Sequence, residues 1–155
     1  MQLRGMKERS PTRDRLRQWG LQVDEGCLLC TTLPESRDHF FYECLFTWSV
    51  WEPISERTGI LPQREWSRSV AEMQTLGENK DLRKLKLLAW QSVIYWVWQE
   101  RNKRLHHNQS RPAHVLIALI CRQIKERILS FRIDSPATSS RLLQRWFELG
   151  NSHRN

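Results

Sequence analysis

The chain lacks an apolar run long enough to cross a membrane. Its most hydrophobic stretch, LKLLAWQSVIYWVW from Leu85 to Trp98, is shorter than the ~20 residues that a spanning helix needs, and it contains Lys86, Gln91 and Ser92. The first residues, MQLRGMKERSPTRDR, lack the apolar segment of a secretory signal. We therefore expect no membrane partner and an intracellular setting, where clustered cysteines bind metal more often than they form disulfides.

Signatures of common catalytic sites are also missing. The sequence has no P-loop, no G-x-S-x-G nucleophile elbow and no H-E-x-x-H zinc-protease motif. Glu52 and Glu56 would lie one turn apart on a helix, but Pro53 falls between them and no other residue positions them for acid–base chemistry. We expect a chain that is not an enzyme.

Acidic residues are few compared with basic ones. The 155 residues include 25 Lys and Arg against 17 Asp and Glu, which gives a formal net charge of +8 and suits a polyanionic partner such as nucleic acid. Two regions are especially basic: the first twenty residues, and residues 99–132 with Arg101, Lys103, Arg104, Arg111, Arg122, Lys125, Arg127 and Arg132. The alternative is that these residues are solvated helix faces.

Alternating strand patterns are absent, whereas helical patterns recur along the chain. With 39% hydrophobic residues and eight Trp, the composition is that of a folded protein. We predict a mainly α fold, in which a small helical domain stabilised by a zinc knuckle is followed by long packed helices. The expected domains are a basic lead at 1–11, a zinc-binding domain at 12–60, a helical region at 61–132, and a linker with a short terminal helix at 133–155.

The helices themselves are predicted from caps and apolar spacing. One covers 12–20, with Thr12 as N-cap and Gly20 after its end. A second carries an apolar stripe over 46–54 and either ends before Pro53 or bends there. A polar helix ends near residue 77, a long helix covers 81–107, and an amphipathic helix covers 113–131. SPATSS is expected to be a linker before a last short helix at 141–150. His106 and His107, at the end of the long helix, are expected to be solvated or capping.

Three of the four cysteines lie with one histidine in an eighteen-residue stretch, CLLCTTLPESRDHFFYEC. The spacing is Cys27-x2-Cys30-x8-His39-x4-Cys44, which supplies the Cys3His ligands of a tetrahedral structural zinc site. Such a site would stabilise the fold and leave no position for a substrate. The alternatives are small core residues, or a disulfide that leaves one cysteine unpaired. Cys121 is isolated and is expected to be a core residue.

The residues around these ligands resemble a known family. The segments TRDRLRQWG, CLLC and ESRDHFFYECLFTWSVW are similar to the zinc-binding domain that follows the reverse transcriptase of plant non-LTR (LINE-type) retrotransposons. Matches outside the ligands are Thr12, Arg13, Asp14, Leu16, Glu35, Ser36, Phe40, Phe41, Val50 and Trp51, and farther on Trp98, Arg101 and Asn102. The close similarity covers about residues 12–55. Leu45 stands where the family often has proline, and no run carries the paired aspartates of a polymerase.

The resemblance implies an accessory role that helps hold nucleic acid or braces a polymerase, and it suggests a nuclear location. We therefore predict a structural Zn(II) ion on Cys27, Cys30, His39 and Cys44, and binding of RNA or DNA. The candidate nucleic-acid-binding residues are Arg13, Arg15, Arg17, Arg101, Lys103 and Arg104. Trp48 and Trp66 are candidates for stacking on bases. The alternative is a module that docks on a reverse transcriptase or on a second copy of itself.

Overall fold

The structure is built from helices, as the sequence predicts. The computed structural model describes residues 11–77 and 79–152, and within these ranges it contains no strand, only an isolated antiparallel bridge between Gly26 and Pro34. The elements are α2 (Arg13–Gln18), the π-helix η2 (His39–Glu43), α3 (Leu45–Thr58), α4 (Trp66–Gln74), α5 (Lys80–His107), α6 (Ala113–Ser130) and α7 (Pro136–Asn151). None of the described helices is both long enough and apolar enough to cross a bilayer.

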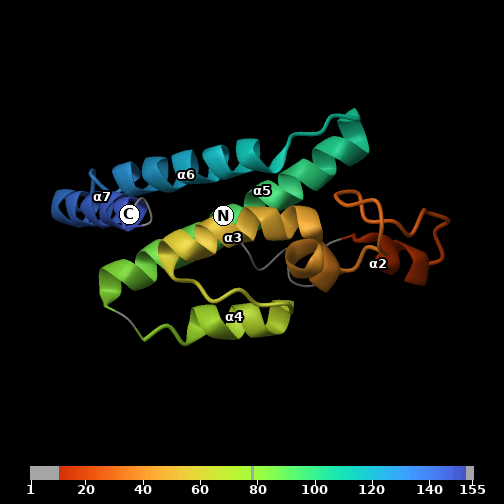
Figure 1. Ribbon diagram of the computed structural model, residues 1–155, viewed down its shortest axis with the longest axis horizontal. Coiled ribbons are helices and arrows are strands. Elements are labelled where there is room, and N and C mark those ends of the chain that lie inside the picture. The colour runs from red at the N-terminus through yellow and green to blue at the C-terminus, as the bar shows by residue number, and fades with distance from the viewer. Residues whose placement is uncertain (1–10, 78, 153–155) are drawn as a thin grey trace.

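Helix α5 is the central element, and α3, α6 and α7 all pack against it (Figure 1). It begins where the Asn79 side chain accepts a hydrogen bond from the backbone N–H of Leu82 at 2.8 Å, which is an N-cap. It ends at Asn108, whose left-handed φ of 48° suits a short polar side chain. The predicted long helix at 81–107 is confirmed. Its middle is buried on several sides because neighbouring helices surround it.

Helix α3 runs through Pro53 without a break. The sequence left open whether this helix ends before Pro53, and that alternative is wrong because the helix continues to Thr58. A proline inside a helix removes one backbone hydrogen bond and costs about 3 kcal/mol. The predicted apolar stripe offsets this cost, since Val50, Trp51 and Ile54 are all buried in the core. Gly59 then ends the helix with a φ of 74°, a conformation that glycine adopts without strain.

Helices α6 and α7 form an antiparallel pair joined by a tight turn (Figure 1). The prediction of a linker at SPATSS is wrong for residues 136–140, which form the first turns of α7. Pro136 occupies the first helical position, where its missing N–H removes no hydrogen bond. Ser139 is buried and donates to the carbonyl of Ile128 at 2.9 Å, which fastens α7 to α6. A polar linker sequence therefore serves as the start of a helix.

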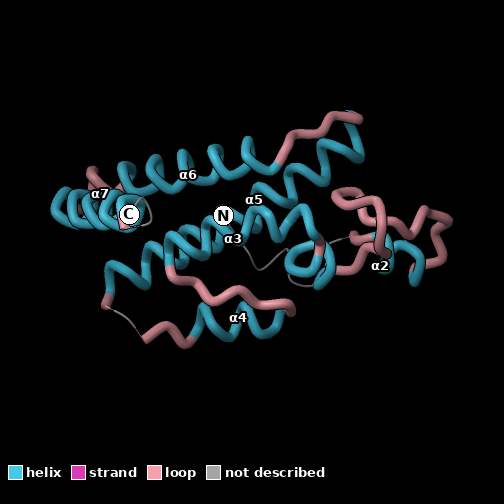
Figure 2. The backbone as a smooth tube through the Cα atoms, viewed as in Figure 1, coloured by secondary structure: helices cyan, strands magenta, loops and turns pink. Residues whose placement is uncertain are grey.

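The cysteine-rich segment lies at one end of this assembly. Loops make up most of it, and Figure 2 shows them beside α2 and next to the C-terminal end of α5. Its buried side chains belong to the same hydrophobic core as those of the long helices. Helix α4 joins the core separately: the Trp66 ring packs against Phe41, and Ser69 accepts a hydrogen bond from the Trp90 indole at 2.7 Å. The segment that carries the candidate metal ligands is therefore supported by the C-terminal end of α5.

Candidate metal centre

The four predicted ligands converge on one point. The Sγ atoms of Cys27, Cys30 and Cys44 and a ring nitrogen of His39 all lie within 4.8 Å of one another. Cys27, His39 and Cys44 are buried and Cys30 is half-buried. Cys121 lies on α6, outside this cluster, and packs partly buried against the core.

The first two ligands sit on a tight turn. Cys27 donates its backbone N–H to the carbonyl of Leu33 at 2.8 Å, and its own carbonyl accepts from the N–H of Thr31 at the same distance. Thr31 has a φ of 60°, which reverses the chain directly after Cys30. The backbone N–H of Leu29 points at the sulfur of Cys27 at 3.4 Å. The C-x2-C spacing thus folds into a loop that turns both sulfurs to the same side.

The other two ligands are placed by a single turn of π-helix. In η2, the backbone N–H of Cys44 donates to the carbonyl of His39 at 2.7 Å, the i to i+5 bond that defines this helix type. The x4 spacing between His39 and Cys44 is what puts them at the two ends of that bond. Ser36 fixes the start of the turn by accepting from the N–H of His39 at 3.1 Å. The sequence predicted the ligands but not the π-helix.

The donor spacings fit a tetrahedral zinc ion. Two thiolates bound to one zinc at about 2.3 Å would lie about 3.8 Å apart, and the sulfurs of Cys27 and Cys44 are 3.9 Å apart. The Cys30 sulfur is 3.3 Å from Nε2 of His39, close to the spacing of a sulfur and a nitrogen on the same ion. A disulfide between Cys27 and Cys44 is excluded at this distance. The residues present would hold zinc through three sulfurs and one imidazole, with no fifth protein donor needed.

The donor groups also change one another's proton affinity. The hydrogen bond from Cys27 lowers the pKa of the Cys44 thiol, whereas the same bond and burial raise the pKa of Cys27. Burial would raise the pKa of Cys30, but hydrogen bonds from Thr32 outweigh it and lower the pKa. Burial would lower the pKa of His39, but its contact with Cys30 outweighs that effect and raises the pKa. Because metal ions bind thiolates and neutral imidazole, zinc binding would release protons from this cluster.

A buried carboxylate supports the loop that carries Cys27 and Cys30. Glu35 accepts hydrogen bonds from the backbone N–H of Arg13 at 3.0 Å and of Leu28 at 3.3 Å. Arg101 reaches the same carboxylate from α5, with Nη2 to Oε1 at 2.7 Å, and it also donates to the carbonyl of Pro11. Glu35 therefore joins α2, the ligand loop and α5. The sequence singled out both Glu35 and Arg101 without indicating that they form a pair.

A second network holds the same loop from the end of α5. Arg104 donates to the carbonyls of Leu28 and Leu29, between the two cysteine ligands, at 3.2 and 2.9 Å. Glu100 is fully buried and binds both Arg104 and Arg111. Burial alone would raise the pKa of Glu100, but the hydrogen bonds from Arg111 and Arg104 outweigh it and lower the pKa. Sequence reasoning did not identify Glu100, although its i,i+4 spacing to Arg104 is a visible signal.

The six candidate nucleic-acid-binding residues divide into two groups. Arg101 is buried, and the guanidinium groups of Arg104 and Arg13 are directed at backbone carbonyls, that of Arg13 at Gly26 at 2.6 Å. The charge of Arg101 is already paired with Glu35 inside the fold. Arg15 and Arg17 lie on α2, where Arg17 forms an ion pair with Glu25, and Lys103 lies half-buried on α5.

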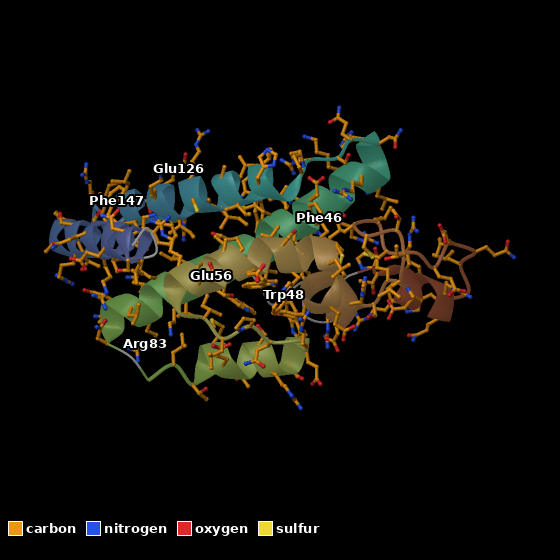
Figure 3. The ribbon with its side chains drawn as sticks, viewed as in Figure 1. Phe46, Trp48, Glu56, Arg83, Glu126 and Phe147 are labelled. Carbon is orange, nitrogen blue, oxygen red and sulfur yellow. The ribbon has the colours of Figure 1, made fainter. Side chains whose placement is uncertain are left out.

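The two tryptophans predicted to stack on bases are occupied by the protein itself. Trp66 is buried against Phe41 and Trp90. Trp48 is half-buried, and the guanidinium of Arg64 lies 3.6 Å from the centroid of its ring. Figure 3 shows Trp48 and Phe46 at the end of α3 next to the ligand segment. Burial thus covers the Trp66 ring, and Arg64 covers one face of the Trp48 ring.

Comparison with known proteins agrees with the geometry. Residues 3–51 match the model of a family described as zinc-binding in reverse transcriptase. This segment includes all four residues of the cluster, α2, η2 and the first half of α3. No curated protein and no solved structure has significant similarity to the chain.

Proposed function

We propose that this chain is a non-catalytic module in which a structural zinc ion fixes residues 27–44 and the basic surface binds RNA or DNA. The observation that carries the proposal is the convergence of a Cys3His donor set inside the segment that resembles a reverse-transcriptase zinc-binding domain. Four protein donors fill a tetrahedral site and leave no open position for water or substrate. The zinc would organise the fold, and binding would take place on surfaces elsewhere. We further propose a LINE-type retrotransposon origin.

Charge supports the nucleic-acid part of the proposal. The chain carries a net charge of +8, and several basic side chains on α5, α6 and the turn after α6 are exposed: Lys80, Arg83, Arg122, Arg127 and Arg132. Arg17 on α2 is also exposed although it is paired with Glu25. A polyanion that contacts such groups releases counterions, so its affinity should fall steeply with salt.

Filter binding of the zinc-loaded protein to single-stranded RNA across a salt series tests this function. We expect binding at low salt, with the logarithm of the association constant falling linearly with the logarithm of salt concentration. A weak signal that does not depend on salt would overturn the nucleic-acid proposal while leaving the zinc site intact. Metal analysis of the same preparation reads out the zinc part separately.

A second function, docking on a polymerase or on another copy of this chain, has its own support. Ile133 is 89% exposed at the turn between α6 and α7, and Phe147 on α7 is 52% exposed (Figure 3). Exposed apolar side chains of this size are typical of interaction surfaces when they cluster. Light scattering of the purified protein reports whether it dimerises, and the filter-binding assay reports whether it binds RNA. A stable dimer that does not bind RNA would favour this second function.

A further inference from the structure

A cavity beside the C-terminal half of α5 combines aromatic and basic side chains. The lining residues are Tyr95, Trp96, Gln99, Asn102, Lys103, His106, His107 and Arg111. All but Arg111 come from successive turns of α5, and Arg111 comes from the loop before α6. We call this the Tyr95 cavity.

The Tyr95 cavity has a volume of ≈ 320 Å³. This volume lies at the small end of the range for ligand sites in proteins, about 300–1,000 Å³. It suits a single planar group rather than a large ligand.

The Tyr95 cavity differs from three other cavities of the protein in the charge of its lining. Three other cavities in the described part of the chain are each lined by at least one carboxylate: Asp81 and Glu148 in the first, Asp14, Glu25 and Glu35 in the second, and Asp24 and Glu25 in the third. No acidic side chain lines the Tyr95 cavity, whereas Lys103 and Arg111 contribute cations. Its lining therefore favours an anionic ligand over a cationic one.

The aromatic side of the cavity is held in place before any ligand arrives. The rings of Tyr95 and Trp96 meet edge to face with centroids 5.3 Å apart. The Trp96 indole N–H donates to the side-chain oxygen of Gln123 on α6 at 3.0 Å, which fixes the orientation of that ring. Arg111 lies 5.6 Å from the Trp96 ring centroid and is anchored by Glu100 at 2.8 Å. A ligand would meet a fixed surface, which lowers the entropy cost of binding.

Polar groups complete the lining. The carboxamides of Gln99 and Asn102 can each donate and accept hydrogen bonds, as the edge of a nucleobase requires. Lys103 is half-buried one turn from Gln99, and His106 and His107 are exposed at the end of the helix. Aromatic rings, amides and a cation are the groups with which proteins bind unpaired nucleotides.

We infer that the Tyr95 cavity holds one nucleotide of a single-stranded nucleic acid, with the base against Tyr95 and Trp96 and the phosphate beside Lys103. The inference rests on the proposed function and gives it a specific site. Base pairs in a duplex hide their faces, so the cavity selects single strands. The inference assigns base stacking to Tyr95 and Trp96, which belong to the apolar segment of α5, instead of to Trp48 and Trp66.

Fluorescence anisotropy with a fluorescein-labelled oligouridylate tests the site, using the full zinc-loaded chain. Tyr95→Leu keeps an apolar side chain but removes the ring, and it should weaken binding at least about fivefold. Lys103→Gln should weaken binding and reduce the slope of affinity against salt by about 1. Arg68→Gln is the matched control, because it also removes one positive charge and Arg68 is exposed on α4, outside the proposed basic surface. Circular dichroism and zinc content confirm that each variant is folded.

The outcomes separate the site from the general function. Weaker binding by Tyr95→Leu and Lys103→Gln, with binding by Arg68→Gln unchanged, supports the inference. Equal effects of Lys103→Gln and Arg68→Gln on binding, with no effect of Tyr95→Leu, would overturn the Tyr95 cavity as a binding site, while RNA binding through general positive charge would stand. Absence of binding by the unmodified protein would overturn both. Competition by polyglutamate as strong as by unlabelled oligouridylate, or by duplex RNA as strong as by the single strand, would also overturn the inference.

Discussion

Glu35 and Arg101 form a buried ion pair between the ligand segment and the central helix. Nη2 of Arg101 lies 2.7 Å from Oε1 of Glu35, and the two side chains are 1% and 0% exposed. Glu35 follows the C-x2-C turn, and Arg101 lies on α5, 66 positions later. Burying two charges is costly unless each is well hydrogen-bonded. Here the backbone N–H groups of Arg13 and Leu28 donate to Glu35, and the carbonyl of Pro11 accepts from Arg101. The pair fixes where the ligand segment sits on the fold.

Arg101→Met should therefore destabilise the protein strongly. Removing one partner leaves the Glu35 carboxylate buried without its counter-charge, at a cost of about 3–5 kcal/mol. Urea unfolding of the zinc-loaded protein, followed by circular dichroism, measures the change in the free energy of unfolding. Arg132→Met is the control, because Arg132 is exposed after α6 and its loss should change stability by less than about 0.5 kcal/mol.

Combining Glu35→Gln with Arg101→Met tests the pairing itself. The double variant removes both charges, so its loss of stability should be smaller than the sum of the two single losses. Strict additivity would mean that the two side chains act independently, contrary to the geometry.

Zinc binding should require the four converging residues and no other cysteine. We expect one equivalent of zinc per chain by elemental analysis, and its loss in Cys30→Ser or His39→Ala, because three ligands no longer close a tetrahedral site. Cys121→Ser should retain the metal, since Cys121 lies outside the cluster. Full zinc occupancy in Cys30→Ser, or a zinc-free unmodified protein after purification with added zinc, would contradict this assignment.

The sequence predicted the ligands because ligand spacing is local. Cys27, Cys30, His39 and Cys44 lie in one short stretch, and the chemistry of zinc restricts both the residue types and their order. The long helix at 81–107 was also predictable, since its apolar residues and its end at Asn108 are encoded by neighbouring residues.

Long-range pairing could not be predicted in the same way. Arg101 and Arg104 look like part of a basic surface in the sequence, and only the fold shows that they reach Glu35 and the carbonyls of Leu28 and Leu29. At two prolines the sequence was also less informative than the fold: it left two outcomes open at Pro53 and predicted a linker at residues 135–140. Burial of the apolar stripe on α3 offsets the cost of Pro53, and Pro136 begins α7 rather than standing in a linker. Tertiary contacts decided the outcome for Arg101, Arg104 and Pro53, whereas Pro136 follows the local preference of proline for the first helical position.

Arg104 should influence zinc affinity although it is not a ligand. Its guanidinium binds the carbonyls of Leu28 and Leu29, which lie between two cysteine ligands, so Arg104→Gln should loosen that turn. Loss of such supporting contacts commonly weakens metal binding by about 10–100-fold. Competition with a chromophoric chelator measures the affinity. The neighbouring Lys103→Gln is the control and should leave zinc affinity unchanged, because Lys103 lines the Tyr95 cavity rather than the ligand turn. Equal zinc affinities for Arg104→Gln and the unmodified protein would contradict the role of Arg104.

Glu100 should make the stability of the protein depend on pH in the acid range. Its pKa in the fold is lowered because the hydrogen bonds from Arg111 and Arg104 outweigh the effect of burial. A group with a lowered pKa contributes stability above its unfolded pKa of about 4.3, and that contribution is lost as the pH falls through the folded value. Glu100→Gln should therefore have a lower free energy of unfolding than the unmodified protein at neutral pH. This gap between the two free energies should narrow below about pH 4.3.

Urea unfolding of both proteins at several pH values measures that gap. Acid also protonates the zinc ligands, but it does so in both proteins, so the difference between their free energies of unfolding isolates Glu100. Glu126→Gln is a suitable control: Glu126 is exposed on α6 and pairs with Arg122 one turn away (Figure 3). An exposed pair of this kind contributes less than about 1 kcal/mol, so its variant should show no such gap. A gap for Glu100→Gln that stays constant down to pH values well below 4.3 would contradict the assignment of this carboxylate as the charged centre of the Arg104–Arg111 network.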